Sequence, residues 1–290
     1  MEFRNLDLGD ERIKKRAVKL LETLAKSPKS SIPQACQGWA ETQATYRFYS
    51  NESVTWEKLL TAHTDQVERR IIKSEEAVIL CLQDTTELDF NGQETEGLGR
   101  LSYDAQRGMY LHPTLCITPE RVAEMAERCP QSRLVYVADR EGDILSLMAK
   151  SKALNTPADW LVRARHNRKL SAEEKLWDSV DKQEVMSRIS LIKPRKKGEK
   201  SRQVQQEIKV LRCTFPRKGK DGIEVTLVQA KEMNPPTGKS PLVWRLLSNR
   251  LVENEAQASE LIDWYRCRWE IEMFFDVLKV GCKVEKLQLA

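Results

Sequence analysis

The chain has 290 residues, 31% of them charged, and its formal net charge at pH 7 is only +5. It is long enough to bury a full core and to hold two or three domains. The seven cysteines are scattered without a Cys-x-x-Cys pair, and the three histidines lie far from metal-finger spacing. These patterns argue against a zinc protein and for reduced thiols. The sequence shows no signal peptide and no long apolar run, which predicts an intracellular protein without a membrane segment.

Residues 1–74 are expected to form a small helical domain. Helices are predicted in residues 8–28, with Asp10 as the N-cap, in residues 39–50 and in residues 55–73. Lysine and arginine crowd the surface of the first helix outside its apolar stripe. This basic surface fits DNA binding, although an ordinary amphipathic bundle would give the same pattern.

From residue 76 the pattern changes to short apolar runs typical of buried strands. The order is strand, strand, strand, helix, strand, helix, strand, which predicts a mixed sheet with helices on its faces. The segments are a strand at 76–84, two strands within 99–119 joined by a turn near residues 106–108, a helix at 119–130, a strand at 133–139, a helix at 143–154 and a strand at 159–166.

Residues 171–240 are expected to be an insertion into the sheet domain, with strands at 205–215 and 222–233. The insertion is basic, since Arg188 to Lys220 includes twelve lysines or arginines and two glutamates. Such a run indicates a polyanion partner or only a solvated loop. A last strand is predicted at 242–248, before the final helix.

Two of the predicted buried strands end in an aspartate, Asp84 and Asp139. Active sites of open α/β sheets gather at the carboxyl ends of strands, although an acid after a strand can also be simple turn chemistry. With Glu272 on the final helix, three carboxylates could converge without a nearby histidine or cysteine. Such a set suits hard divalent cations such as Mg²⁺, which can cleave phosphodiesters in pairs.

The final helix, "YRCRWEIEMFFDVLK" at residues 265–279, carries a polar stripe beside an apolar flank. At about 100° per residue, the stripe covers an arc of roughly 60°. It could be a surface stripe with an ordinary ion pair at spacing i,i+4, or it could supply cations and a hydroxyl for phosphate oxygens. The stripe consists of Tyr265, Arg268, Glu272 and Lys279, and the flank of Ile271, Phe274, Phe275 and Leu278.

Several motifs resemble the IS-four family of bacterial insertion-sequence transposases, which are of the DDE type. They are "LQDTTELDF", "YVADREGDI", the Tyr-x2-Arg-x3-Glu-x6-Lys spacing of the final helix, "LGDERIKKRAVKLL", "TYRFYSN" and "EMNPPTGKSPLVW". They occur in the family's order over nearly the whole chain. The four-residue spacing on the final helix is specific to the family, whereas "DTT" or "DRE" alone would not be a specific match.

The resemblance implies an α/β fold: a ribonuclease-H-like mixed sheet with flanking helices, a β-rich insertion and an N-terminal all-helical DNA-binding region. Residues 1–74 would be the DNA-binding domain, and residues 75–170 the first part of the catalytic core. Residues 171–240 would be the basic insertion, and residues 241–290 the last core strand with the signature helix.

The resemblance also implies a catalytic triad. Asp84, Asp139 and Glu272 match the DDE residues that bind two Mg²⁺ ions, for which Mn²⁺ is a possible substitute.

Further residues match DNA contacts of the family. Tyr265, Arg268, Lys279 and Arg163 match residues that bind phosphates near the cut. Trp244 matches the tryptophan on which a flipped base stacks. Without the resemblance, Trp244 could equally be a core aromatic on a strand.

The function implied is cut-and-paste transposition by a bacterial, cytoplasmic and nucleoid-associated enzyme. Water attacks the phosphodiester at the transposon end, and the freed 3′-OH makes a hairpin that is opened before the 3′-OH joins target DNA. The implied partners are double-stranded DNA, as inverted repeats and as target, and a second copy of the chain, since the family works as a homodimer on DNA.

Two departures from the family pattern modify this expectation. The segment after Thr118 is shorter than in the family, and the chain stops at Ala290, where the family continues into helices that pair two transposases. These departures predict an internally deleted and truncated member with impaired pairing. A catalytically impaired DNA-binding regulator or inhibitor of transposition therefore stays open as an alternative, as does a structure-specific nuclease with the same core.

Overall fold

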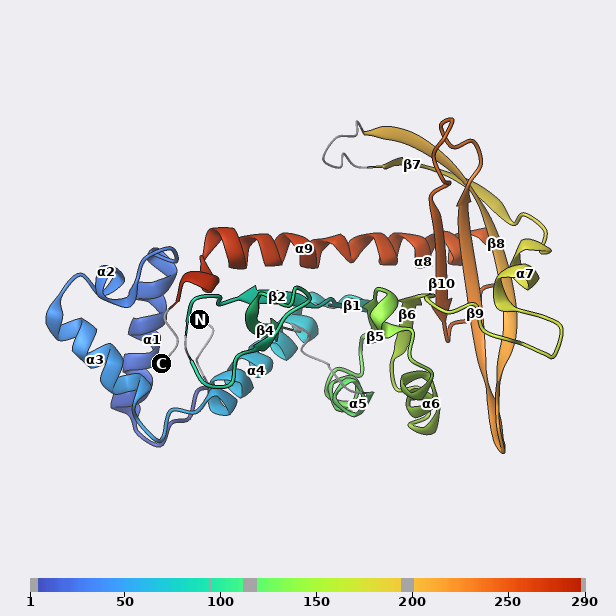
Figure 1. The fold of residues 1–290 in the computed structure, drawn as a ribbon. Helices are drawn as coiled ribbons and strands as arrows, with labels where there is room; N and C mark the ends of the chain where they lie inside the picture. Colours follow the sequence, from blue (N-terminus) through green and yellow to red (C-terminus); the bar gives the residue numbers. More distant parts are fainter. Residues whose placement is uncertain (1–4, 94, 112–118, 194–200, 288–290) are drawn as a thin grey trace. The chain divides into compact units, whose positions relative to one another are not determined.

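The computed structural model describes residues 5–93, 95–111, 119–193 and 201–287 (Figure 1). Residues 112–118, next to the segment that was expected to be shorter than in the family, lie outside the described residues, and so do residues 194–200 of the basic run. No helix in the described part of the chain has the length and apolar character needed to cross a bilayer.

The chain forms two compact units. The first combines residues 1–76, 85–115 and 271–290, and the second combines residues 77–84 and 116–270. The division into the four segments expected above stays a prediction.

The first unit contains the predicted N-terminal helices α1 (Glu11–Lys26), α3 (Trp39–Tyr49) and α4 (Trp56–Ser74). The N-cap of α1 is confirmed, because the Asp10 carboxylate accepts a hydrogen bond from the Arg12 backbone N–H at 2.7 Å. A short helix that the sequence did not predict, α2 (Ile32–Cys36), lies between α1 and α3. The helices enclose a small core of Leu6, Leu8, Ala17, Leu20, Phe48 and Ala62.

The first unit also contains a small antiparallel sheet of order β2-β4-β3, with β2 at Thr86–Asp89, β3 at Gly99–Arg100 and β4 at Arg107–Leu111. The sequence predicted β3 and β4 as part of one mixed sheet and did not predict β2, but the three strands hydrogen-bond to one another in a sheet of their own. Gly108 is required for this pairing, because a Cβ there would lie 1.9 Å from the Leu88 carbonyl oxygen.

The second unit is built on a seven-stranded sheet of order β1-β5-β6-β10-β9-β8-β7. The neighbours β1 (Val78–Gln83), β5 (Arg133–Ala138) and β6 (Asp159–Arg163) are parallel, and β10 (Val243–Ser248) is antiparallel to β6. The sheet then continues through the insertion, whose strands β9 and β8 form a long hairpin (Figure 1). These strands are β7 (Ser187–Lys193), β8 (Arg202–Arg217) and β9 (Lys220–Glu232).

Helices pack on both faces of this sheet, as the alternation of side chains along β5 requires. Val135 and Val137 share one core cluster with Ile262 of helix α8. Tyr136 and Ala138 belong to the other cluster, together with side chains of α6 and α7. The helices of this unit are α5 (Pro119–Arg128), the 3₁₀ turn η1 (Arg140–Gly142), α6 (Leu145–Ala153), α7 (Leu176–Asp181) and α8 (Glu255–Cys267).

The predicted final helix is divided in the structure. It begins within α8, continues as α9 (Trp269–Asp276) and ends in a π-helical turn, η2 (Val277–Gly281), before the 3₁₀ turn η3 (Val284–Lys286). The i→i+5 pattern of a π-turn displaces Lys279 from the arc calculated for a regular α-helix. Phe274, expected on the packed flank, is 49% exposed.

Candidate active site

Asp84 and Asp139 occupy corresponding positions on two adjacent parallel strands of the second unit. Gln83, the last residue of β1, pairs with Ala138, the last residue of β5, so the two aspartates are the next pair along the strands. Neighbouring strands lie about 4.8 Å apart. The side chains of Asp84 and Asp139 remain 22% and 31% exposed. The sheet therefore presents two accessible carboxylates side by side at the carboxyl ends of its parallel strands.

Arg268, between α8 and α9, contacts both carboxylates. Its Nη1 lies 2.5 Å from Asp84 Oδ2, and its Nη2 lies 3.9 Å from Asp139 Oδ2. The residue is only 5% exposed, and its guanidinium packs at 5.9 Å and 5.6 Å from the ring centroids of Tyr265 and Trp269. A planar guanidinium can serve two carboxylates at once because its donors are fixed in a fork. Arg268 is thus the cation that balances the two aspartates.

Tyr265, near the end of α8, supplies a hydroxyl to the same place. The hydroxyl donates a hydrogen bond to Asp139 Oδ1 at 3.3 Å, and the residue is 3% exposed. Burial, followed by the charge of Asp139, raises the pKa of Tyr265 above its ordinary value. The phenol therefore stays protonated and acts as a donor to the Asp139 carboxylate.

Arg163 extends the row of charged groups onto the third parallel strand. Ala138 of β5 pairs with Val162 of β6, which places Arg163 opposite Asp139. Its Nη1 lies 3.8 Å from Asp139 Oδ1, and its Nη2 donates to the Val243 carbonyl at 3.5 Å. Three adjacent strands thus present the sequence acid, acid, base at one end of the sheet.

Trp244 is part of the packing around this site. Its ring meets the ring of Tyr265 edge to face, with centroids 5.9 Å apart, and it packs against the core cluster that contains α8. The structure therefore gives Trp244 a structural role beside Tyr265, and its role as a base-stacking platform stays a prediction.

Glu272 and Lys279 belong to the first unit. Glu272 lies half-buried on α9. Lys279 donates to the Glu87 carbonyl and forms an ion pair with Glu285 at 3.5 Å. The approach of Glu272 to the two aspartates stays a prediction. In the described ranges, no three histidine, cysteine or acidic side chains gather closely enough to hold a metal ion.

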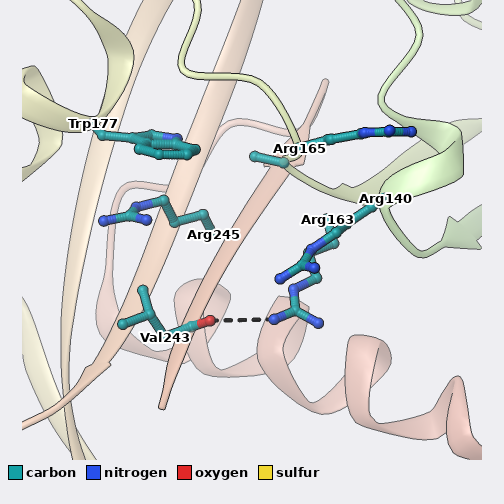
Figure 2. Close-up of a pocket in the computed structure, with 7 residues that line it drawn as sticks. Arg140, Arg163, Arg165, Trp177, Val243 and Arg245 are labelled. Atoms are coloured by element: carbon teal, nitrogen blue, oxygen red, sulfur yellow. Dashed lines mark hydrogen bonds between the residues drawn. The ribbon is translucent and has the colours of Figure 1, made fainter. Parts of the chain in front are cut away.

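Arg163, together with residues that the sequence analysis did not single out, lines a cavity of about 450 Å³ in the second unit. In Figure 2, Arg245 lies against Trp177 on one side, while Arg163 reaches the Val243 carbonyl on the other. Two features of the sequence could have indicated this cluster. Arg140 directly follows Asp139, and a second arginine, Arg165, comes two residues after Arg163 in "LVRARH". The lining residues are Arg140, Arg163, Ala164, Arg165, Trp177, Val243 and Arg245.

Two protein-family models match parts of this chain. Residues 120–290, more than half of the chain, match the family described as the transposase DDE domain. The chain belongs to the DDE transposase family. Its fold is accordingly ribonuclease-H-like, as predicted, and residues 1–54 match a second family, described as transposase DNA-binding.

A solved structure similar to this DDE transposase chain is a cryo-EM structure of a piggyBac transposase synaptic complex with hairpin DNA. The TM-score is 0.42 at 9% sequence identity, and the match covers 92% of this chain. The chain spans 58% of the length of that piggyBac transposase chain.

The donor set at the strand ends fits the cofactor class of the family. DDE transposase domains generally use divalent metal ions. Asp84 and Asp139 offer accessible carboxylate oxygens, the ligands that hard divalent cations prefer. Both carboxylates lie next to arginines, Asp84 next to Arg268 and Asp139 next to Arg163 and Arg268.

Proposed function

We propose that the chain is a cut-and-paste DNA transposase of the IS-four type whose active site is built on Asp84, Asp139 and Glu272. The observation that supports this best is the pair of aspartates at adjacent strand ends, held by one buried arginine. Two carboxylates so close together need a cation, and phosphodiester chemistry needs cations at the reacting oxygens.

Asp84, Asp139 and Glu272 would hold two Mg²⁺ ions, with Mn²⁺ as a possible substitute. When bound, such ions lower the pKa of the attacking water and stabilise charge on the leaving oxygen. Tyr265 orients the Asp139 carboxylate by its hydrogen bond and remains a proton donor. Arg268 would exchange its contact with the carboxylates for a contact with a DNA phosphate.

The remaining predicted residues would bind the DNA strand. Arg163 and Lys279 are suited to phosphate contacts because both carry cations that are held in place by backbone carbonyls. Trp244 would stack on an unpaired base if its packing against Tyr265 opened.

Double-stranded DNA is the proposed substrate, as the inverted repeats of a mobile element and as target DNA. Residues 1–54 are proposed to bind the repeat, because this segment matches the transposase DNA-binding family. Two copies of the chain would assemble on two DNA ends. The proposed setting is the nucleoid of a bacterial cell.

Cleavage and joining assays test this function. A labelled duplex that carries the inverted repeat next to the gene should be cut in Mg²⁺ to leave a 3′-OH, pass through a hairpin and join a plasmid. Asp84→Asn and Asp139→Asn should each lower the cleavage rate about a thousandfold, because several kcal/mol of charge stabilisation would be lost. Asp263→Asn, on the exposed side of α8, is the matched control.

The same assays separate the alternatives. Binding of the repeat without any cleavage would identify a DNA-binding regulator or inhibitor of transposition. Cleavage without joining to the plasmid would identify a nuclease.

A further inference from the structure

We propose that the tip of the β8–β9 hairpin is a second contact for duplex DNA, which holds backbone phosphates at the end of the sheet opposite the catalytic aspartates. The hairpin tip consists of residues 217–220, Arg-Lys-Gly-Lys. The inference rests on the proposed function in that duplex DNA is the partner. The tip lies within the second unit, as do the strands and the helix that support it.

The hairpin tip concentrates positive charge. Lys218 and Gly219 form the turn, and Arg217 pairs directly with Lys220 in the last rung of the ladder. Lys218 and Lys220 are exposed, and Arg217 is half-buried. Within the described residues, none of the three cations forms an ion pair. Residues 216–222 include these three cations and a single acid, Asp221.

This arrangement favours an anionic partner. Like charges directly opposite one another destabilise an antiparallel ladder, and Arg217 and Lys220 occupy such positions. An anion that lies over the pair would relieve this repulsion. DNA phosphates supply negative charge at regular intervals, so a backbone can serve several cations of the tip at once.

The base of the tip is rigid. Phe215 and Ile223 pair across the hairpin just before the tip, and both are buried in the core cluster that contains side chains of α6 and α7. The Arg168 guanidinium lies 5.3 Å from the centroid of the Phe215 ring. Lys152, in the last turn of α6, donates a hydrogen bond to the Gly222 carbonyl at 2.8 Å. The cations are therefore presented on a fixed support, which lowers the entropy lost on binding.

The tip is remote from the catalytic end of the sheet. Arg163, level with Asp139, pairs with Leu246, and Leu246 pairs with Val228 of β9. Lys220 precedes Val228 by eight residues along β9. At about 3.3 Å per residue, the tip lies roughly 26 Å along the strands from the level of Asp139. The phosphates held there are therefore not those that meet the catalytic carboxylates.

The hairpin also reaches past the core strands. The β9–β10 ladder ends at the pair of Thr226 with Ser248, and β9 begins six residues earlier, at Lys220. In Figure 1 the β8–β9 hairpin accordingly continues beyond the end of β10. At about 3.3 Å per residue, this projection measures roughly 20 Å, which is close to the width of a small domain's sheet and enough to reach a duplex alongside the core.

The side chains of the tip fit phosphates and not base edges. Lysine ammonium groups act as point charges, and residues 217–220 include no asparagine or glutamine that could read an adenine in a bidentate way. Contacts to phosphate position a protein on DNA without reading its sequence. We therefore expect the tip to bind duplex DNA of any sequence, either next to the inverted repeat or in the target.

Salt titrations of the full chain test the contact. The double variant Lys218→Gln/Lys220→Gln should bind an unrelated 40-base-pair duplex more weakly than the wild type. The slope of log affinity against log salt should become shallower by about two, because two phosphate contacts are lost. The matched control is Lys182→Gln/Arg188→Gln, which removes two exposed cations that are paired with Glu174 and Glu207 and should keep the slope. An unchanged slope in the tip variant would overturn the proposal.

Photo-crosslinking locates the contact and its source. Lys218→p-benzoylphenylalanine in the full chain should crosslink to duplex DNA. Glu255→p-benzoylphenylalanine, in the exposed first turn of α8, should not, because α8 packs on the other face of the sheet. A repeat-containing duplex and an unrelated duplex with different labels would be offered together, and the label recovered shows which DNA the tip holds. Crosslinking at Lys218 no stronger than at Glu255 would refute the assignment.

The outcome for the tip is separable from that for the proposed function. A chain that cuts and joins the repeat but shows no contact at Lys218 would remove this inference and keep the transposase. A chain that crosslinks DNA at Lys218 but never cuts it would keep the inference and remove the transposase proposal.

Discussion

Arg268 and Asp84 are 184 positions apart in the chain, and Nη1 of the arginine lies 2.5 Å from Oδ2 of the aspartate. The contact joins the end of the first core strand to the signature helix. It also places a permanent cation where the proposed reaction needs a divalent one. The same two carboxylates can therefore be balanced by the protein itself or by metal ions, and the two arrangements compete.

This competition predicts the behaviour of Arg268→Gln. Without metal, the variant leaves Asp84 and Asp139 adjacent with less compensation, so the free energy of unfolding should fall by about 2 kcal/mol. Added Mg²⁺ should stabilise the variant more than the wild type, because the ion replaces the lost cation. Thermal melts with and without Mg²⁺ measure both effects. Arg266→Gln, which removes an exposed ion pair with Asp263, should change neither. If Mg²⁺ did not change the melting temperature of the variant, the result would count against the two aspartates as metal ligands.

Trp244 offers a test between packing and base stacking. Because its ring packs against Tyr265 and the core, Trp244→Ala should lower the free energy of unfolding by about 3 kcal/mol, whereas Trp244→Phe should cost less. Denaturant unfolding of both variants gives these values. If Trp244→Ala were as stable as the wild type but failed only at the hairpin step, base stacking would be its main role.

Asp159 predicts how the second unit responds to acid. Burial raises the pKa of this carboxyl, but hydrogen bonds from Arg133 and Asn249 and the charges of Arg133 and Arg250 lower it by more, so the folded pKa lies below its ordinary value. A depressed carboxyl pKa stabilises the fold above the unfolded pKa of about 3.9 and loses this contribution as pH falls toward the folded pKa.

Asp159→Asn should therefore destabilise the protein by about 3 kcal/mol at pH 7, and the difference from wild type should shrink below about pH 4. Urea unfolding at several pH values measures it. A constant difference over the whole pH range would show that the loss comes from packing and not from the charge.

The basic surface of α1 predicts salt-dependent DNA binding. Lys15 is exposed, whereas Lys19 forms an ion pair with Glu41 at 2.8 Å. Lys15→Gln should weaken duplex binding and reduce the slope of log affinity against log salt by about one, because one phosphate contact is lost. Lys19→Gln should have the smaller effect. Titrations of the full chain at several salt concentrations decide it, and binding that salt does not weaken would rule out a phosphate-contacting surface on α1.

The parts of the fold set by local chemistry could be predicted from the sequence. Asp10 marked the start of α1, and the apolar runs before Asp84 and Asp139 marked two parallel strands whose ends meet. The partners of each strand could not be predicted. Nothing in the sequence shows that β9 would hydrogen-bond to β10 and so continue the core sheet, or that β3 and β4 would form a separate sheet with β2.

The candidate site shows the same limit. The spacing of Tyr265 and Arg268 predicted that both lie on one side of a helix. It did not predict that they are buried against carboxylates. Apart from Arg163, the cavity arginines were not predicted, because β6, β10 and η1 come together only through the sheet. The π-turn at Lys279 likewise cannot be predicted by a calculation that assumes a regular helix.

The continuation of the sheet into the insertion has a consequence for how the chain can be shortened. Residues 243–248 of β10 are paired with residues 226–231 of β9 on one side, while the other side of β10 pairs with β6. Removing the insertion would turn β10 into an edge strand with a row of unsatisfied backbone groups, an open template for pairing with other chains. We therefore expect a version without residues 187–232 to self-associate through that edge unless a charged or proline-containing substitute strand blocks it.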